Sequence, residues 1–387
     1  MKTAIWLYMF LFLAFFDLHA QYPILTPFAV SLGAAPVFIG WMMGIYALTH
    51  LPGNLIAGTV IDKHGSRRYI VFSLVSAGIV LLLQSQVHYP WQLLALRSIS
   101  GFVLAFLSPA CLTLLASLSS DKITQGKFMS GHGVVHTLAS VVSPAAGAFI
   151  VAKAGYSATF QSLGWLLIAT GIMAIFSVPG AQRTAVQTTG TSHAEPTAAV
   201  PKLQVPLRIF ILPFVISCSQ GILFFELPLR STGVDGIMST GILFSVMSIG
   251  ALLTLSMLFV NRYSPYKRVL GGIFLLAVCF YCLAALPIPL TATLLVLGMA
   301  KGIIFPAMAS LFIQLSGGSR LGRVFSLQSI AMSIGSFFGP IAAGQLRTFV
   351  SPYFIAFVLL MIGLMMLPIS RKSGSLLYPN INQKPVS

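Results

Sequence analysis

Long apolar stretches separated by short polar connections dominate the sequence. Apolar runs of about 20 residues, long enough to cross a bilayer core as a helix, occur twelve times. Their expected bounds are 4–25, 37–60, 68–87, 91–117, 127–152, 158–179, 208–229, 237–260, 268–287, 290–314, 324–347 and 351–370. The pattern therefore predicts an all-α membrane protein with twelve transmembrane helices and both termini on the same side of the bilayer.

Residues 180–206 interrupt this pattern. They are rich in Thr, Ala, Gln, Ser and Pro and carry no helical stripe, which is typical of a flexible linker. We therefore expect an N-terminal six-helix bundle over 1–179, a cytoplasmic linker over 180–206, a C-terminal six-helix bundle over 207–371 and a cytoplasmic tail over 372–387.

The two halves repeat each other in an ordered series of motifs. Phe15-Phe16-Asp17-Leu18 in the first span returns as Phe224-Phe225-Glu226-Leu227 in the seventh, Gly101 and Pro109 return as Gly298 and Pro306, and Pro144 returns as Pro340. Parallel halves of this kind, related by an axis along the membrane normal, place a substrate site between them near the membrane centre. The repeat thus predicts two pseudo-symmetric bundles around one site.

Composition excludes an ordinary soluble protein and charge gives the orientation. Hydrophobic residues make up 57% of the chain and charged residues only 7%, against roughly a quarter in soluble domains. Of the 22 Lys and Arg, 17 fall on the side of the termini, three on the other side (Lys153, Arg230, Arg347) and two inside spans. By the positive-inside rule the termini are cytoplasmic. The formal charge of +16 then needs no nucleic-acid partner.

The connection between the second and third spans is a charged island. It holds Gly58, Asp62, Lys63, Gly65, Arg67 and Arg68. Glycines permit a tight turn, and Asp62 can accept from backbone amides or from an Arg. Ordinary anchoring charges would explain the basic residues but neither Asp62 nor the two glycines.

Six plus six spans, a central linker and this loop resemble the major facilitator superfamily over essentially the whole chain. The family's pattern Gly-x-x-x-Asp-Arg/Lys-x-Gly-x-Arg/Lys-Arg/Lys is matched by the six residues of the island, and Leu93, Arg97 and Gly101 resemble its fourth-span pattern, with Ser100 in place of Gln. The resemblance implies that the island is a conformational latch between the bundles, closed in one transport state and open in the other.

The eleventh span carries a face of small residues. Gly335, Gly339, Pro340 and Gly344 are similar to the Gly-x-x-x-Gly-Pro-x-x-Gly-Gly signature of the superfamily's exporters. That signature normally belongs to the fifth span, where this chain has only Ala139, Ser143, Pro144 and Gly147. Such a face also lets helices approach closely and bend, so we expect it to pack helices. As a whole the chain resembles the twelve-span drug/proton antiporter group.

Asp17, Arg97, Glu226 and Lys301 are the acids and bases well inside the spans. Charges at such depth are costly, so they line a cavity or pair with each other. At 1.5 Å per residue, Asp17 lies roughly 20 Å along an outward-running helix and Arg97 roughly 9 Å along an inward-running one. In a core about 30 Å thick these depths are nearly equal, which makes an Asp17–Arg97 pair plausible.

These charges suggest a proton-coupling site. An apolar environment raises the pKa of a carboxyl group and a nearby arginine lowers it, so a carboxyl group that exchanges between the two can take up and release a proton near neutral pH. We hypothesise that Asp17 and Glu226 carry protons and that Arg97 tunes Asp17. The alternatives are a static ion pair or, for Glu226, a position near the outer surface.

Lys301, His132 and His136 are candidate substrate-binding residues. Lys301 could contact an anionic group of a substrate or neutralise Glu226, and the sequence leaves both open. His132 and His136 stand four residues apart, on one helical face with metal-ligand spacing, but no third strong ligand lies near them in the sequence. We therefore expect a polar substrate contact rather than a metal; His19 and His50 are weaker candidates.

These observations indicate a secondary active transporter of the bacterial inner membrane, monomeric and without cofactor. We expect proton-coupled efflux of a small amphipathic or zwitterionic molecule by alternating access; a proton-coupled nutrient symporter and an exporter of a metal-chelating metabolite remain as alternatives. An enzyme is not expected, because the chain contains no Gly-x-Ser-x-Gly, His-Glu-x-x-His or Walker motif. Its partners are the substrate, protons and lipid.

Overall fold

The computed structural model describes residues 2–118, 121–178, 206–230, 233–316 and 321–367, so the expected tail and nearly all of the expected linker lie outside the described residues. Within these ranges the chain is helical. The α-helices are α1 (Lys2–Ala20), α2 (Tyr22–Ser31), α3 (Pro36–His64), α4 (Ser66–Gln84), α5 (Pro90–Leu104), α6 (Leu107–Ser117), α7 (Lys122–Ser177), α8 (Ile211–Arg230), α9 (Val234–Ser256), α10 (Pro265–Ala285), α11 (Leu290–Leu315), α12 (Leu321–Leu346) and α13 (Pro352–Met366). Short 3-10 turns η1 (Leu207–Phe210) and η2 (Leu258–Arg262) precede α8 and α10.

These helices make twelve spans, as the sequence predicts. Nine described stretches are long and apolar enough to cross a membrane, and one of them, Gly131–Ser177 in α7, has 47 residues and reverses direction at Gly155. There φ is 81°, a left-handed conformation that glycine adopts without strain. α3, which carries many polar residues, and the shorter α13 complete the set.

Two spans are broken, and prolines explain both breaks. The first span is interrupted at Gln21 and continues through α2 to Ser31, beyond the predicted end at residue 25. Pro23 has no N–H to donate to the carbonyl four residues earlier, yet fits the first turn of a new helix. Pro109 has the same effect between α5 and α6, where residues 105–106 leave the helical pattern.

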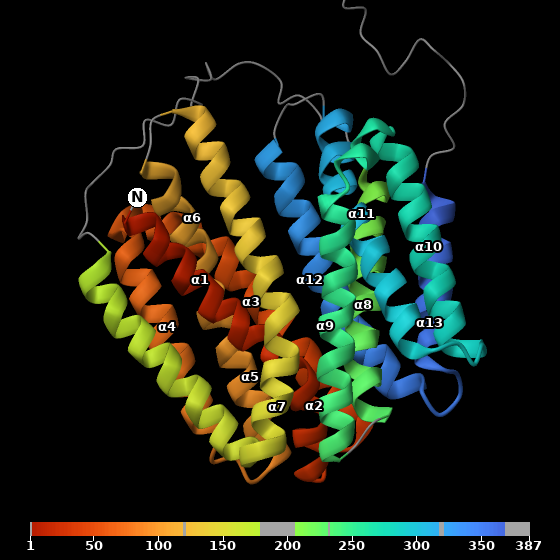
Figure 1. Ribbon diagram of the computed structural model, residues 1–387, viewed down its shortest axis with the longest axis horizontal. Coiled ribbons are helices and arrows are strands. Elements are labelled where there is room, and N and C mark those ends of the chain that lie inside the picture. The colour runs from red at the N-terminus through yellow and green to blue at the C-terminus, as the bar shows by residue number, and fades with distance from the viewer. Residues whose placement is uncertain (1, 119–120, 179–205, 231–232, 317–320, 368–387) are drawn as a thin grey trace, which may run out of the picture.

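Figure 1 shows two groups of helices side by side, with α1 and α3–α7 mainly on the left, α8–α11 and α13 on the right, and α2 and α12 in the middle, where the groups meet. Large apolar side chains such as Trp165 (62% exposed) and Phe176 (84% exposed) lie on the outside of the molecule, as expected for helices that face lipid. We call the end where α1 begins and α8 begins the linker end, and the opposite end, at the bottom of Figure 1, the far end.

The repeat seen in the sequence reappears in how the two bundles touch. A Cβ atom built on Gly40 of α3 would lie 2.5 Å from the carbonyl oxygen of Pro340 in α12, and one built on Gly241 of α9 would lie 2.6 Å from that of Pro144 in α7. The two crossings use matching prolines and matching helices of the two halves. Both lie at the far end, where backbone-to-backbone contact closes the gap between the bundles.

Candidate functional site

A cavity of about 720 Å³ lies between the two bundles, the position that the repeat predicts. Helices α1, α2, α3, α5 and α7 line one side and α8, α9, α11 and α12 the other. Its wall reaches toward the linker end through His50 and Asn54 of α3 and Leu255 of α9. The glycine crossings and the stacked Tyr22 and Phe224 rings, with centroids 4.1 Å apart, close the far end.

Asp17 and Arg97 are brought together, but through a third side chain. The Gln21 side-chain amide donates to Asp17 Oδ1 at 2.9 Å, and Arg97 Nη1 donates to Gln21 Oε1 at 3.0 Å. All three residues are buried, and the guanidinium lies over the Tyr46 ring at 4.6 Å. The expected direct ion pair is therefore a relay, because the break at Gln21 turns its amide between the two charges.

The relay separates a charge that faces the cavity from one that does not. Arg97 is among the lining residues of the cavity, whereas Asp17 lies behind Gln21 and is not. A glutamine both donates and accepts, so this one forms a hydrogen bond with the carboxylate and with the guanidinium at once. A change in the position of Arg97 would therefore alter the hydrogen bonding of Asp17 through the Gln21 side chain alone.

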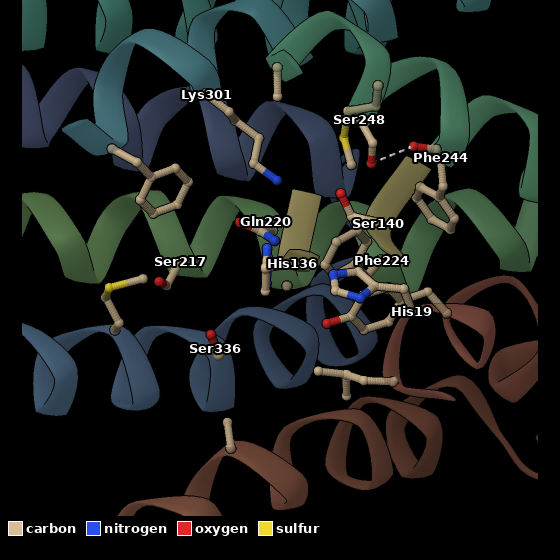
Figure 2. Close-up of a pocket in the computed structure, with 18 of the residues that line it drawn as sticks. His19, His136, Ser140, Ser217, Gln220, Phe224, Phe244, Ser248, Lys301 and Ser336 are labelled. Carbon is tan, nitrogen blue, oxygen red and sulfur yellow. Dashed lines mark hydrogen bonds between the residues drawn. The ribbon is translucent and has the colours of Figure 1, made fainter. Parts of the chain in front are cut away.

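Lys301 lines the cavity from α11. Its amine is directed into the cavity, toward the side of α8 that carries Gln220 (Figure 2), and lies 5.8 Å from the centroid of the Phe224 ring. Within the described part of the chain, no carboxylate lies within 4.0 Å of this amine. Lys301 is thus a basic residue of a membrane-spanning helix that lies beside an aromatic face and has no carboxylate partner among the described residues.

Histidines gather on the opposite wall. His136 of α7 and His19 of α1 meet with ring centroids 5.1 Å apart, and His132 lies one turn from His136 toward the linker end, with Nε2 3.3 Å from Ser108 Oγ. The Nδ1–H of His19 donates to the Phe15 carbonyl at 2.7 Å, which leaves its Nε2 available. All three histidines line the cavity. Among the described residues no three metal-ligating side chains form a group that could hold a metal ion.

Glu226 occupies a different part of the molecule from the cavity. Its Oε1 accepts from Arg230 Nε at 3.0 Å and from Arg347 Nη2 at 3.4 Å, and the residue is 2% exposed. Arg230 in turn lies over the Tyr353 ring at 4.6 Å. This geometry favours a static ion pair at the far end over a proton carrier for Glu226. It also leaves Lys301 without Glu226 as a partner.

The six residues of the charged island lie at the linker end, around the turn from α3 to α4. Gly65 adopts φ 86°, which fits its predicted part in the turn. Arg67 donates to the Ile175 carbonyl of α7, within the same bundle, while Asp62, Lys63 and Arg68 are exposed. A Cβ on Gly58 would meet nothing within 4 Å. For the described residues, none of the six makes a hydrogen bond or ion pair to α8–α13 in this state.

The small-residue face of α12 packs on two helices. Gly335 and Gly339 face the α8 carbonyls of Phe214 and Cys218, within the C-terminal bundle. Pro340 and Gly344 face α3 of the other bundle, where a Cβ on Gly344 would lie 2.7 Å from the Pro36 carbonyl oxygen. One face of α12 therefore holds its own bundle together and also closes the far end.

Several site residues escaped the sequence analysis. Gln21 was identifiable only as a polar residue four positions after Asp17, on the same helical face. Tyr22, Phe224 and Phe244 form an aromatic group at the closed end of the cavity, with Phe224 and Phe244 centroids 5.2 Å apart. Aromatic residues are common throughout these spans, so although Phe224 belongs to a repeated motif, nothing in the sequence indicated that it meets Tyr22 and Phe244. The position of Gln220 on the cavity wall likewise became apparent only from the folded structure.

Comparisons with known proteins agree with this architecture. The family model described as Major Facilitator Superfamily matches residues 7–297 and 258–380. The chain is 23% identical over 316 residues to multidrug resistance protein MdtG of Escherichia coli O17:K52:H18, covering 78% of this chain and 76% of the relative, and 22% identical to that protein in other strains of the species.

Two solved structures share the fold, each with a TM-score of 0.72. A nucleoside transporter NupG mutant is 15% identical and covers 95% of this chain and 100% of its own. A bacterial homologue of the human lysosomal transporter Spinster, in an inward-facing and occupied conformation, is 14% identical and covers 94% of this chain and 95% of its own.

Proposed function

The chain belongs to the Major Facilitator Superfamily, and from this premise we propose that it exports a small amphipathic or zwitterionic molecule in exchange for protons. Family members are multi-pass membrane transporters rather than enzymes, as the missing enzyme motifs suggest. The similarity to multidrug resistance protein MdtG supports efflux as the direction of transport.

The observation that carries the proposal is a cavity between two pseudo-symmetric bundles, shut at one end and extending to the other. Alternating access requires such an arrangement, because rocking one bundle against the other exposes a fixed central site to each side in turn. With the termini assigned to the cytoplasm from the distribution of Lys and Arg, the present state faces inward. Export then starts with capture of the substrate from the cytoplasm or inner leaflet.

We assign the proton to Asp17. A single glutamine joins this carboxyl group to Arg97 on the cavity wall, so a substrate that holds Arg97 against Gln21 keeps Asp17 ionised and favours release of its proton, and departure of the substrate frees Arg97 to move away. A carboxyl group that loses its cationic partner in an apolar environment binds a proton more readily. Protonation and substrate binding can thereby be linked through the Gln21 relay.

The other charged groups complete the cycle. We propose that the island of Asp62, Lys63 and Arg68, exposed here, engages the C-terminal bundle when the cytoplasmic end closes. Glu226, held by Arg230 and Arg347, anchors α8 to the connection after α12; of the two acids in the spans, Asp17 is the one whose hydrogen bonds lead to the cavity. We place the monomeric transporter in the bacterial inner membrane.

Everted membrane vesicles test the direction and the coupling. Respiration acidifies their interior and quenches a pH-sensitive dye, and candidate amphipathic solutes are then added. An exporter that exchanges solute for protons restores the fluorescence in vesicles that contain the protein and not in vesicles that lack it. Solute accumulation in right-side-out vesicles driven by an inward proton gradient, with no response in everted ones, would contradict export and identify a symporter.

A further inference from the structure

We infer that the transported molecule is an organic anion, whose carboxylate or phosphate group binds Lys301 and whose apolar body packs on the aromatic group formed by Tyr22, Phe224 and Phe244. This inference rests on the proposed transport function and narrows its substrate class. It assigns to Lys301 the first of the two alternatives that the sequence left open.

The distribution of charge is the first argument. The chain has six acidic residues, and of these Asp17 and Glu226 are the two inside the spans. Asp17 is bound by Gln21 in the relay to Arg97, and Glu226 by two arginines at the far end. Neither lines the cavity. Lys301 therefore has no carboxylate partner among the described residues.

The cavity wall is basic. The described lining residues include two basic side chains, Arg97 and Lys301, and no carboxylate. A cation held in a membrane-spanning helix is costly and ordinarily pairs with an acid or serves a functional site. Because the two acids inside the spans, Asp17 and Glu226, are engaged elsewhere, the missing negative charge is best supplied by the ligand. A cationic substrate would instead meet uncompensated repulsion at the cavity centre.

Polar groups around Lys301 suit the rest of such an anion. Gln220 and Lys301 line the same wall and also share a second, small hollow between α8 and α11. Ser217 and Ser248 flank them on α8 and α9 (Figure 2). The Gln220 amide and the Ser217 hydroxyl can donate to the oxygens that the lysine leaves free, whereas the Ser248 hydroxyl already donates to the Phe244 carbonyl at 3.1 Å. The lysine ammonium group is compact and donates to carboxylate or phosphate oxygens without the fixed fork geometry of an arginine.

Aromatic rings define where the apolar body of the ligand lies. Phe224 lies beside the Lys301 amine and stacks on Tyr22, while Phe244 meets Phe224 edge to face at an interplanar angle of 84°. A flat apolar ligand can extend from the lysine over these rings. The cavity thus recognises an anionic group and an apolar body together.

A matched set of naphthalene compounds tests the inference on the purified full-length protein. Isothermal titration at pH 7.5 compares 2-naphthoate, 2-naphthyl phosphate, 2-naphthylmethanol and 2-naphthylmethylamine, which share a ring system and differ in charge. We expect one or both anions to bind about tenfold or more tightly than the alcohol, and the amine to bind most weakly. Comparing the two anions shows which oxyanion the site prefers.

Substitutions link this preference to the lysine. Lys301→Gln should abolish the preference for anions, while Lys301→Arg should keep most of it. Lys153→Gln, at an exposed position of α7 outside the cavity, is the matched control and should bind as the wild type does. The inference is overturned if the amine binds as well as the anions, if no anion preference is seen, or if Lys301→Gln retains it in a protein that still melts cooperatively.

No proton gradient is present in this measurement, so its result is independent of coupling. Anion-selective binding together with failure of the vesicle assay would overturn the proposed antiport and leave the inference standing. Solute-driven dequenching by cationic compounds alone would support antiport and overturn the inference.

Discussion

At the scale of single residues, the site depends on a glutamine that joins two charges. Gln21 accepts from Arg97 and donates to Asp17, so neither charge is left without a polar contact in a buried position. Removing such a bridge leaves both partners partly unsatisfied, at a cost of about 1–3 kcal/mol for each buried group. The relay should therefore matter for both stability and coupling.

We predict that Gln21→Leu lowers proton-driven exchange by about tenfold or more, since the carboxyl group of Asp17 no longer senses Arg97. The melting temperature of the purified protein should also fall. Gln84→Leu is the matched control, because both polar side-chain atoms of Gln84 are buried without a partner and the residue lies outside the cavity. That change should leave exchange intact and stability unchanged or higher. Equal rates of proton-driven exchange in the two variants would show that Gln21 does not take part in coupling.

Residue-level chemistry could be predicted from the sequence only in part. The unusual acids and bases in the spans pointed to Asp17, Arg97 and Lys301, since charge in a membrane is rare enough to stand out. From their depth along the helices, Asp17 was correctly predicted to lie near Arg97. Depth gave no information about rotation around the helix axis, and so missed the bridging Gln21. For Glu226, an extra basic residue four positions later was visible, but Arg347 came close only through folding.

At the scale of helices, close backbone crossings close the far end. α3 meets α12 at Gly40 and Pro340, and α7 meets α9 at Pro144 and Gly241. Small residues at such crossings let helix backbones touch, which is the main source of packing energy between membrane helices. Because the crossings join the two bundles rather than helices of one bundle, they belong to one state of the transport cycle.

We predict that Gly40→Val shifts the protein toward the state that is open at the far end. The added methyl groups would press on the Pro340 carbonyl, and overpacking of this kind costs about 1–3 kcal/mol. A shift of about tenfold in the equilibrium should result. Ser336→Cys in the cavity wall should then react faster with a membrane-impermeant thiol reagent added from the far side.

Gly271→Val in α10 is the control for this experiment, because a Cβ at Gly271 meets nothing within 4 Å. It adds the same side chain to a helix and should leave the labelling rate unchanged. Faster labelling in both variants would point to general loosening rather than to the crossing. No change in Gly40→Val would mean that α3 and α12 do not hold the far end closed.

The element boundaries illustrate what periodicity does and does not determine. Apolar length identified all twelve spans, since a helix must satisfy its backbone within the bilayer. Prolines within otherwise apolar runs were not sufficient to place the breaks at Gln21 and after α5, because other prolines, such as Pro52 and Pro340, lie inside continuous helices. Whether a proline breaks or only bends a helix depends on the neighbouring helices that satisfy the freed carbonyl.

At the scale of the whole molecule, the internal repeat carried the strongest prediction. Matching motifs in the two halves placed a site between two bundles, and a 720 Å³ cavity lies there. Pseudo-symmetry relates the frameworks of the halves but not their chemistry. The N-terminal half contributes histidines and Arg97, whereas the C-terminal half contributes Lys301, Gln220 and two of the three aromatic rings. The repeat therefore predicts where a ligand binds, and the differences between the halves determine which ligand it is.

We propose that a proton on Asp17 drives movement of solute through this cavity. Proteoliposomes containing the wild type or Asp17→Asn, loaded with a solute identified in the vesicle assay, separate the two processes, because exchange of labelled for unlabelled solute needs no net proton movement. We predict that Asp17→Asn retains this exchange within a few-fold and loses accumulation driven by a proton gradient. Gradient-driven accumulation at the wild-type level in Asp17→Asn would contradict the account.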